Sequence, residues 1–169
     1  LFIFGGVNYE PYRSKFESLI GRKVDSVELY PASEGFFAFQ DRQNEPGMLL
    51  QLDSGMFYEF IVADTFFDAS PTRLTLKDVK IGVNYVIIIS TNAGLWAYNI
   101  GDTVQFTSVA PYRVIVSGRI KHFISAFGEH VIAKEVEHAL LSALKTTEVS
   151  VSEFTVAPQI EPLEGLPYH

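Results

Sequence analysis

The chain has 169 residues, 47% of them hydrophobic and 14% aromatic, and its 13 Lys and Arg against 20 Asp and Glu give a formal net charge of −7. This apolar content is enough to bury a core and excludes a disordered tail, while no run approaches the roughly 18–20 apolar residues of a membrane-spanning helix. The lack of cysteine excludes a disulfide scaffold and Cys-ligated zinc, and the acidic balance disfavours sequence-independent nucleic-acid binding. We therefore expect a cytoplasmic protein without nucleic-acid or membrane partners.

The first 35 residues predict a strand, a helix and a second strand. Leu1–Phe4 is an apolar run typical of a buried strand, and Pro11 suits the first position of a helix that Gly21 ends. Val24–Leu29 predicts a strand that stops at Tyr30–Gly35, where proline and glycine forbid a regular continuation. The helix presents one apolar face, which we expect to lie in the core: Tyr12, Phe16, Leu19 and Ile20.

The middle of the chain predicts strands. Phe36–Phe39, Met48–Leu52 and Met56–Phe60 are aromatic or apolar runs separated by turn residues, which indicates an antiparallel meander. Thr75–Val79 predicts one helical turn. Further runs favour strands, the second and third of them flanking a loop at Asn99–Asp102: Tyr85–Ser90, Leu95–Tyr98, Thr103–Thr107 and Tyr112–Val116.

The pattern changes at Gly118. Ala133–Lys145 repeats apolar residues every four positions and predicts the surest helix, and Val149–Val156 alternates like a strand. The fold class is thus α+β, with residues 1–117 in a large β-rich nucleotide-binding domain, 118–121 as a hinge and 122–169 beginning a small α+β domain. We expect the chain to be an internal or C-terminal piece of a longer one, since it starts inside a strand pattern and ends in a proline-rich stretch.

Several common enzyme signatures are absent. The sequence has no Walker A motif, no Gly-x-Gly-x-x-Gly, no Gly-x-Ser-x-Gly and no His-Glu-x-x-His. Its histidines lack the i, i+4 spacing of a zinc pair, so we expect them to face solvent or helix ends: His122, His130, His138 and His169.

Three loops place small residues and a charge at strand ends: Tyr30–Gly35, Asn99–Asp102 and Gly118–Lys121. Each could be an ordinary turn. In order along the chain, Tyr-Pro-Ala-Ser-Glu-Gly at 30–35, Tyr-Asn-Ile-Gly-Asp at 98–102 and Ser-Gly-Arg-Ile-Lys at 117–121 resemble motifs of the adenylate-forming superfamily. With the aromatic strand Phe57–Phe60, they most closely resemble the auxin-responsive Gretchen Hagen family of acyl acid–amido synthetases.

The resemblance implies an ATP and Mg²⁺ site. Tyr30 would pack its ring on adenine, Ser33 would bind the α-phosphate, and Glu34 would be the Mg²⁺ ligand and a catalytic residue. Tyr58 would line the nucleotide pocket, and Asp102 would accept hydrogen bonds from the ribose hydroxyls.

It also implies a role for the hinge. Arg119 would reach the ribose or phosphate, and Lys121 would be a catalytic residue at the pivot of the small domain. The Gly5-Gly6 turn would lie near the acyl substrate. The sequence departs from the family at Pro31, in place of glycine or alanine, and at Asn99, in place of arginine.

The function implied is an ATP-dependent ligase that converts a carboxylic acid to an acyl-adenylate and passes the acyl group to an amino acid or a thiol. Two alternatives stay open: a non-catalytic domain that binds a nucleotide or a protein, and a small β-rich interaction module whose motifs match by chance. For the 169 residues alone we expect no turnover, and self-association through the apolar Leu1–Phe4 segment.

Overall fold

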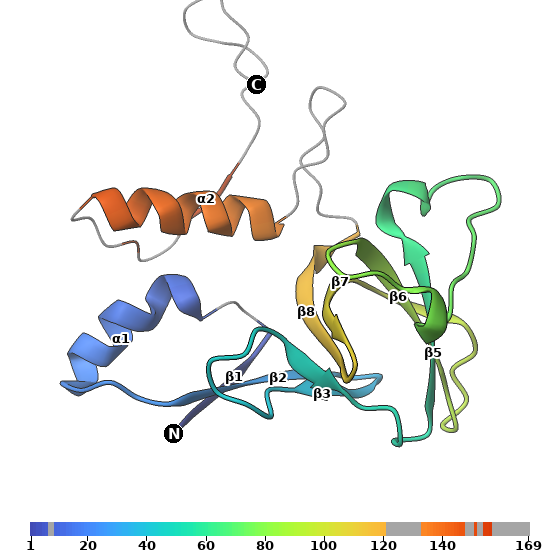
Figure 1. Ribbon diagram of the computed structural model, residues 1–169, viewed down its shortest axis with the longest axis horizontal. Coiled ribbons are helices and arrows are strands. Elements are labelled where there is room, and N and C mark those ends of the chain that lie inside the picture. The colour runs from blue at the N-terminus through green and yellow to red at the C-terminus, as the bar shows by residue number, and fades with distance from the viewer. Residues whose placement is uncertain (7–8, 121–132, 148–150, 152–153, 157–169) are drawn as a thin grey trace, which may run out of the picture.

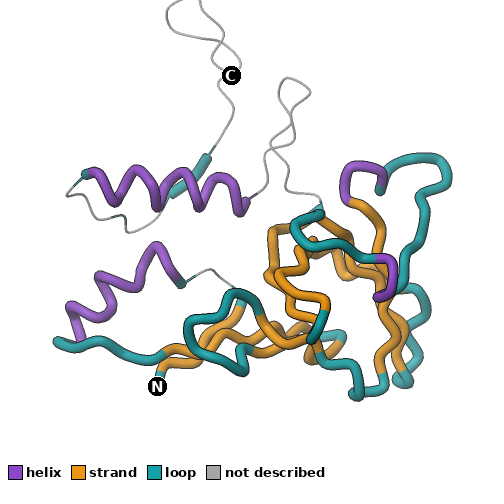
Figure 2. Tube along the Cα trace, in the orientation of Figure 1, coloured by secondary structure: helices purple, strands orange, loops and turns teal. Residues whose placement is uncertain are grey.

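The structure is a computed structural model that describes residues 1–6, 9–120, 133–147, 151 and 154–156. Eight strands, two α-helices and three short 3₁₀ helices follow one another in the described part of the chain (Figures 1 and 2). Their bounds are β1 (Phe2–Gly5), η1 (Glu10–Tyr12), α1 (Arg13–Ile20), β2 (Ser26–Ala32), β3 (Gly35–Phe39), β4 (Met48–Leu50), β5 (Met56–Val62), η2 (Ala63–Thr65), η3 (Leu76–Asp78), β6 (Asn84–Thr91), β7 (Tyr98–Val109), β8 (Tyr112–Arg119) and α2 (Ala133–Thr146).

The strands form one mixed sheet in the order β1-β2-β3-β4-β8-β7-β6-β5, in which only the β1–β2 pair is parallel. The sheet is strongly curved, so that β5–β8 stand at an angle to β1–β3 (Figure 1). The curvature brings distant strands together: a Cβ added to Gly35 of β3 would lie 3.0 Å from Sδ of Met56 on β5. The predicted α+β class is confirmed.

The core fills the inside of this curve. Its side chains alternate along the strands, as expected when one face of each strand is buried. The members that are at most 1% exposed come from β3 to β8: Phe37, Ala38, Met48, Phe60, Tyr85, Ile87, Ile89, Val104, Phe106 and Val114. A smaller apolar group lies on the opposite face of β5 and β6 and includes Ile120.

The first helix is present but packs differently from the expectation. Gly21 ends α1 with φ 80°, and its N–H donates to the carbonyl of Glu17, as the glycine predicted. Phe16 contacts Phe2 with a ring-centroid distance of 4.5 Å, but Leu19 is 81% exposed. The prediction that the whole stripe is core was wrong, because periodicity shows an apolar face without showing that anything covers all of it.

Two strand boundaries and one strand pairing also differ from the prediction. β2 continues through Pro31 to Ala32, with a register shift between Tyr30 and Pro31 that lets the proline remain in the strand. β4 pairs with β8 and not with β5, so the expected local meander is interrupted. The expected loop at Asn99–Asp102 lies inside β7, which runs unbroken from Tyr98 to Val109.

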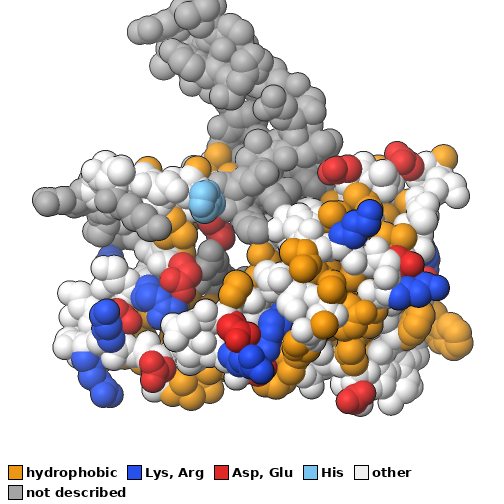
Figure 3. Space-filling view, viewed as in Figure 1, with side chains coloured by type: hydrophobic (Ala, Val, Ile, Leu, Met, Phe, Trp, Pro, Cys, Tyr) orange, Lys and Arg blue, Asp and Glu red, His pale blue; other side chains and the backbone are white. Residues whose placement is uncertain are grey.

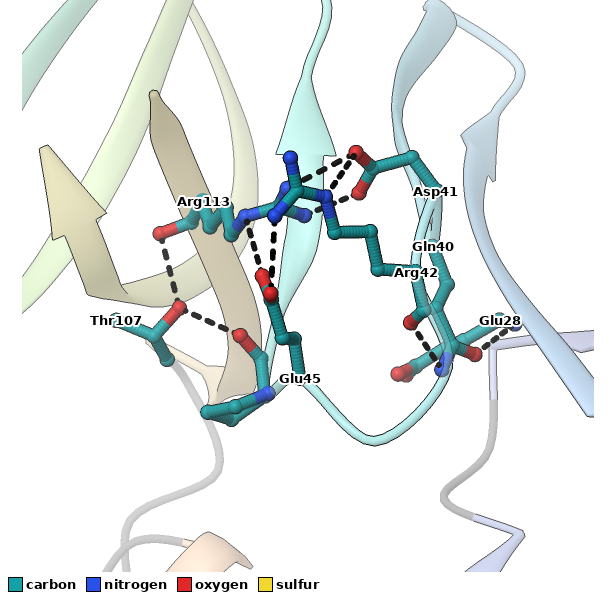
Figure 4. Close-up of polar contacts among 8 residues, drawn as sticks. Glu28, Gln40, Asp41, Arg42, Glu45, Thr107 and Arg113 are labelled. Carbon is teal, nitrogen blue, oxygen red and sulfur yellow. Dashed lines mark hydrogen bonds and ion pairs between the residues drawn. The ribbon is translucent and has the colours of Figure 1, made fainter. Parts of the chain in front are cut away.

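A cluster of charges fixes the loop between β3 and β4 (Figure 4). Arg113 of β8 is 4% exposed. Two of its guanidinium nitrogens donate hydrogen bonds to Asp41, one of them over 2.9 Å to Oδ2. Glu45 pairs with Nε of Arg113 at 3.6 Å and with Arg42 at 3.0 Å. Two arginines are thus balanced by two carboxylates, which allows Arg113 to be buried.

The last described element is α2, which confirms the helix predicted near 133–145 and contacts β8 and η1. The predicted strand Val149–Val156 falls largely outside the described residues, and its described positions, Val151 and 154–156, carry no strand. No helix within the described part of the chain has the length and apolar character needed to cross a membrane.

Candidate functional site

Three residues from separate sequence motifs meet at the carboxylate of Asp102. The hydroxyl of Tyr30 donates a hydrogen bond to Oδ2 over 2.9 Å, and Nε of Arg119 lies 2.9 Å from Oδ1. Tyr30 is on β2, Asp102 on β7 and Arg119 at the end of β8. Both oxygens of one carboxylate therefore have a donor, and 72 residues separate Tyr30 from the acid it contacts.

The path of β7 places this acid. The pairing with β6 shifts register between Val86 and Ile88, opposite the segment Asn99–Thr103, and Gly101 has φ 86°. The Asn99 side chain accepts from the Gly101 N–H at 2.8 Å, so the asparagine that replaces the family's arginine supports the turn of the backbone. Such an irregularity re-aims a side chain, and here Asp102 is 7% exposed.

The surroundings of Tyr30 keep its hydroxyl protonated. The residue is 5% exposed, and its ring meets Phe37 edge-on with a centroid distance of 5.0 Å. Burial, followed by the negative charge of Asp102 and the hydrogen bond to it, raises the pKa of Tyr30 far above its usual value, while Arg119 opposes the rise. The phenol is therefore a permanent donor. Because its ring lies in the core, the expected stacking on adenine stays a prediction.

Ser33 and Glu34 form the turn of the β2–β3 hairpin, directly after the strand that carries Tyr30. Ser33 is exposed and Glu34 is half-buried. Neither residue makes a hydrogen bond or ion pair with Asp102, so the fold brings them to the same end of β2 as Tyr30 but not to the carboxylate itself. No group of three or more His, Cys, Asp or Glu among the described residues could hold a metal ion unaided.

Tyr58 lies on β5, belongs to the same core cluster as Tyr30, and is 3% exposed. Burial raises its pKa to about 12, partly offset by a hydrogen bond with the Ser54 side chain. Its hydroxyl lies 3.8 Å from Sδ of Met56.

The remaining predicted positions lie apart from this group or outside the described residues. Gly5 ends β1, and a Cβ there would lie 2.7 Å from the carbonyl oxygen of Leu29. Lys121 lies outside the described residues. Gly118, at the start of the expected hinge, has φ 150° and lies within β8 beside a register shift. That backbone is one that residues with a side chain rarely adopt.

The sequence motifs missed a shallow cavity of about 370 Å³ near the start of β5. Its wall combines backbone and apolar side chains with the hydroxyls of Ser90 and Thr91, and Trp96 at its rim is 86% exposed. Figure 3 shows further apolar side chains at several places on the strand-rich part of the surface. A signal in the sequence was the chain's single tryptophan, Trp96, which lies within the predicted strand Leu95–Tyr98. The lining residues are Gly55, Met56, Phe57, Ser90, Thr91, Leu95 and Trp96.

The fold is a curved sheet whose buried Asp102 carboxylate is held between a phenol and a guanidinium. Residues 49–119 match the sequence model described as GH3 family central domain, where GH3 stands for the Gretchen Hagen family. The resemblance seen in the motifs is thereby confirmed: the chain is similar to the GH3 acyl acid amido synthetases, and the match to their central domain covers 49–119.

Two curated proteins are similar. A probable indole-3-acetic acid-amido synthetase, GH3.9 of Oryza sativa subsp. japonica, is 27% identical over 146 residues, which are 80% of this chain and 33% of that protein. The jasmonoyl–L-amino acid synthetase JAR4 of Nicotiana attenuata is 29% identical over 100 residues, 57% of this chain and 17% of that protein. The chain thus spans a third or less of the curated relatives it matches.

Solved structures share the fold. The GH3.15 acyl acid amido synthetase superposes with a TM-score of 0.64 at 21% identity, over 86% of this chain and 27% of that one. A second structure, AtGH3.15 in complex with 2,4-DB, gives a TM-score of 0.60 at 19% identity, over 79% of this chain and 23% of that one. At these identities the similarity shows a shared fold.

Proposed function

We propose that this chain forms part of an ATP-dependent ligase that activates a carboxylic acid as an acyl-adenylate and joins the acyl group to an amine, as an amino acid provides, or to a thiol. The observation that carries the proposal is the buried Asp102 carboxylate, held by Tyr30 and Arg119. Its relatives are named as amido synthetases, which supports the amine as acceptor.

The chemistry of the donors suits a nucleotide. An ionised carboxylate is an acceptor with two oxygens, so Asp102 would bind ribose hydroxyls. Arg119, at the rim and 61% exposed, would move to an anionic group such as a phosphate, to which a guanidinium binds well. Ser33 would offer its hydroxyl to the α-phosphate from the exposed hairpin turn.

Glu34 is the residue that would hold Mg²⁺. One carboxylate fits this ion, because protein-bound Mg²⁺ commonly takes one or two carboxylates and completes its shell with phosphate oxygens and water. When bound, the ion would supply charge neutralisation as pyrophosphate leaves. Tyr58 would close the apolar side of the nucleotide pocket from β5.

We assign residues 1–117 to the large domain, 118–121 to a hinge and 122–169 to the start of a small domain. Gly118, with its φ of 150° in β8, supports a pivot at this place. Rotation about it would carry Lys121 toward or away from the nucleotide, and so prepare one site for two successive half-reactions. The 169 residues alone are expected to show no turnover.

Acid-dependent exchange between ATP and pyrophosphate, measured on the full-length protein with a panel of carboxylic acids, tests the proposal. Exchange is expected with at least one acid. The Asp102→Ala variant is expected to raise the KM for ATP, because the ribose loses its acceptor. A protein that binds ATP without exchange would instead be the non-catalytic nucleotide-binding domain, and one that does neither would overturn the nucleotide site.

A further inference from the structure

The hydroxyl of Tyr30 has no task in the nucleotide site as described so far. We propose that Tyr30 is a positioning residue, whose buried hydroxyl holds Oδ2 of Asp102 so that Oδ1 faces the ribose hydroxyls. The inference rests on the proposed function, since it names how the acceptor of that site is oriented.

The two oxygens of Asp102 have donors of different kinds. Tyr30, on Oδ2, is 5% exposed, and its ring packs against Phe37. Arg119, on Oδ1, has a side chain that is 61% exposed, so it can turn into solvent without any change in the core. A ligand hydroxyl can therefore replace Arg119 at Oδ1 more easily than Tyr30 at Oδ2, because replacing Tyr30 would require the core to open.

The curvature of the sheet brings Tyr30 close enough to Asp102 for their hydrogen bond. β3, β4 and β8 separate β2 from β7 in the strand order, so the 2.9 Å bond crosses the inside of the curve and is not a contact between neighbouring strands. The register shift after Tyr30 and the irregular pairing of 99–103, which contains Asp102, re-aim both backbones at this point.

A phenol suits the task because it cannot ionise here. Burial and the adjacent carboxylate raise the pKa of Tyr30 well beyond physiological pH, so it remains a donor under all ordinary conditions. A donor fixed before the ligand arrives lowers the cost of orienting the acceptor when the ligand binds.

The test is binding of ATP and of 2′,3′-dideoxy-ATP to the full-length protein by titration calorimetry. Tyr30→Phe keeps the ring and deletes the oxygen. We expect its dissociation constant for ATP to rise about tenfold, the usual order for losing one buried hydrogen bond to a charged group. With dideoxy-ATP, which lacks both ribose hydroxyls, the variant and the unmodified protein should bind equally.

Tyr85→Phe is the matched control. Tyr85 is 1% exposed, and its hydroxyl accepts from the Lys80 N–H at 2.9 Å, away from Asp102. The same atom is deleted from an equally buried ring, so any general loosening of the core appears in this variant too. Its affinities for both nucleotides should match those of the unmodified protein.

A second comparison keeps the test sharp if Tyr30→Phe lowers the melting temperature. In an Asp102→Asn background, adding Tyr30→Phe should change ATP affinity less than twofold, because the group to be oriented has already been altered. Equal losses for ATP and dideoxy-ATP, or unchanged ATP affinity in Tyr30→Phe, would overturn the positioning role. If the unmodified protein bound no ATP, the proposed function would fail, and this inference with it.

Discussion

Arg113 shows how one residue can be costly to bury and still stabilise its surroundings. Its guanidinium is 4% exposed, and it is held by Asp41 and Glu45 from the loop after β3. Removing one partner of such a pair leaves the other charge uncompensated, which is more damaging than never having had the pair. Arg42 contacts the same two carboxylates from the surface, with 61% of its side chain exposed.

Arg113→Met is therefore expected to lower the melting temperature clearly more than Arg42→Met does. The Arg113 hydrogen bond lowers the pKa of Asp41, so the pair's stabilisation is present above the unfolded Asp value of about 3.9 and is lost as pH falls through the folded value. In thermal melts, the difference in melting temperature between Arg113→Met and the unmodified protein should become smaller as the pH falls from 7 to 3. A gap that is constant with pH would show that Arg113 acts through packing alone.

Phe60 provides a test of how much the apolar core contributes to stability. It is fully buried, and its ring meets Phe106 at 5.1 Å and Tyr85 at 6.1 Å, both edge-on. Phe60→Ala should reduce the free energy of unfolding by about 3–5 kcal/mol, through lost burial and the cavity left behind. Phe57→Ala, three residues away and 59% exposed, is the control and should cost less than about 1 kcal/mol by denaturant titration.

The sequence singled out Tyr30, Asp102 and Arg119 because each belongs to a short motif. It could not reveal that Tyr30 donates to Asp102, since the two are 72 residues apart and meet through the curvature of the sheet. The buried ion pairs of Arg113 were not predicted for the same reason. A charged residue within an apolar strand is a signal of a buried pair, but its partners, Asp41 and Glu45, lie in a loop far away in the chain.

At the scale of elements, the loop from β3 to β4 depends on a glycine. Gly47 has φ 89°, and a Cβ there would lie 2.3 Å from Oγ1 of Thr107, the hydroxyl that donates to the Pro46 carbonyl. The close approach of the loop to β7 thus leaves no room for a side chain.

Gly47→Ala is expected to destabilise the protein more than Gly82→Ala. Gly82 has φ 79° with no atom within 4 Å of an added Cβ, so its change reports backbone strain alone, about 1–2 kcal/mol. The difference between the two, measured by denaturant titration, isolates the steric conflict with Thr107. Equal losses would mean that the loop moves aside without cost.

The elements that were predicted well are those whose local pattern decides the outcome. The β-branched run of β6 and the four-residue repeat of α2 are examples. The predicted pairing of β4 with β5 was wrong, because its actual pairing with β8 depends on the course of more than sixty intervening residues. The exposure of Leu19 was missed because an apolar stripe does not reveal what covers it.

At the scale of the whole molecule, the two edges of the sheet differ. β5 is partly covered, since Phe60 exchanges backbone hydrogen bonds with Leu74 at 2.9 and 2.8 Å. Among the described residues β1 pairs with β2 alone; Ile3 on β1 is 57% exposed, and Leu1 just before it is 78% exposed. An apolar edge strand with free backbone groups is a template for pairing with another chain.

The 169-residue chain is therefore expected to self-associate through β1, with an average mass that rises with concentration in light scattering. Ile3→Lys should reduce this association, because a charge on an edge strand is costly to bury against a second copy. Ile81→Lys is the matched control, since Ile81 is 60% exposed and lies away from β1, and it should leave the association unchanged. Equal effects of the two lysines would show that general charge repulsion acts and not the β1 edge. A chain that stays monomeric at high concentration would show that the exposed residues of β1 do not drive assembly.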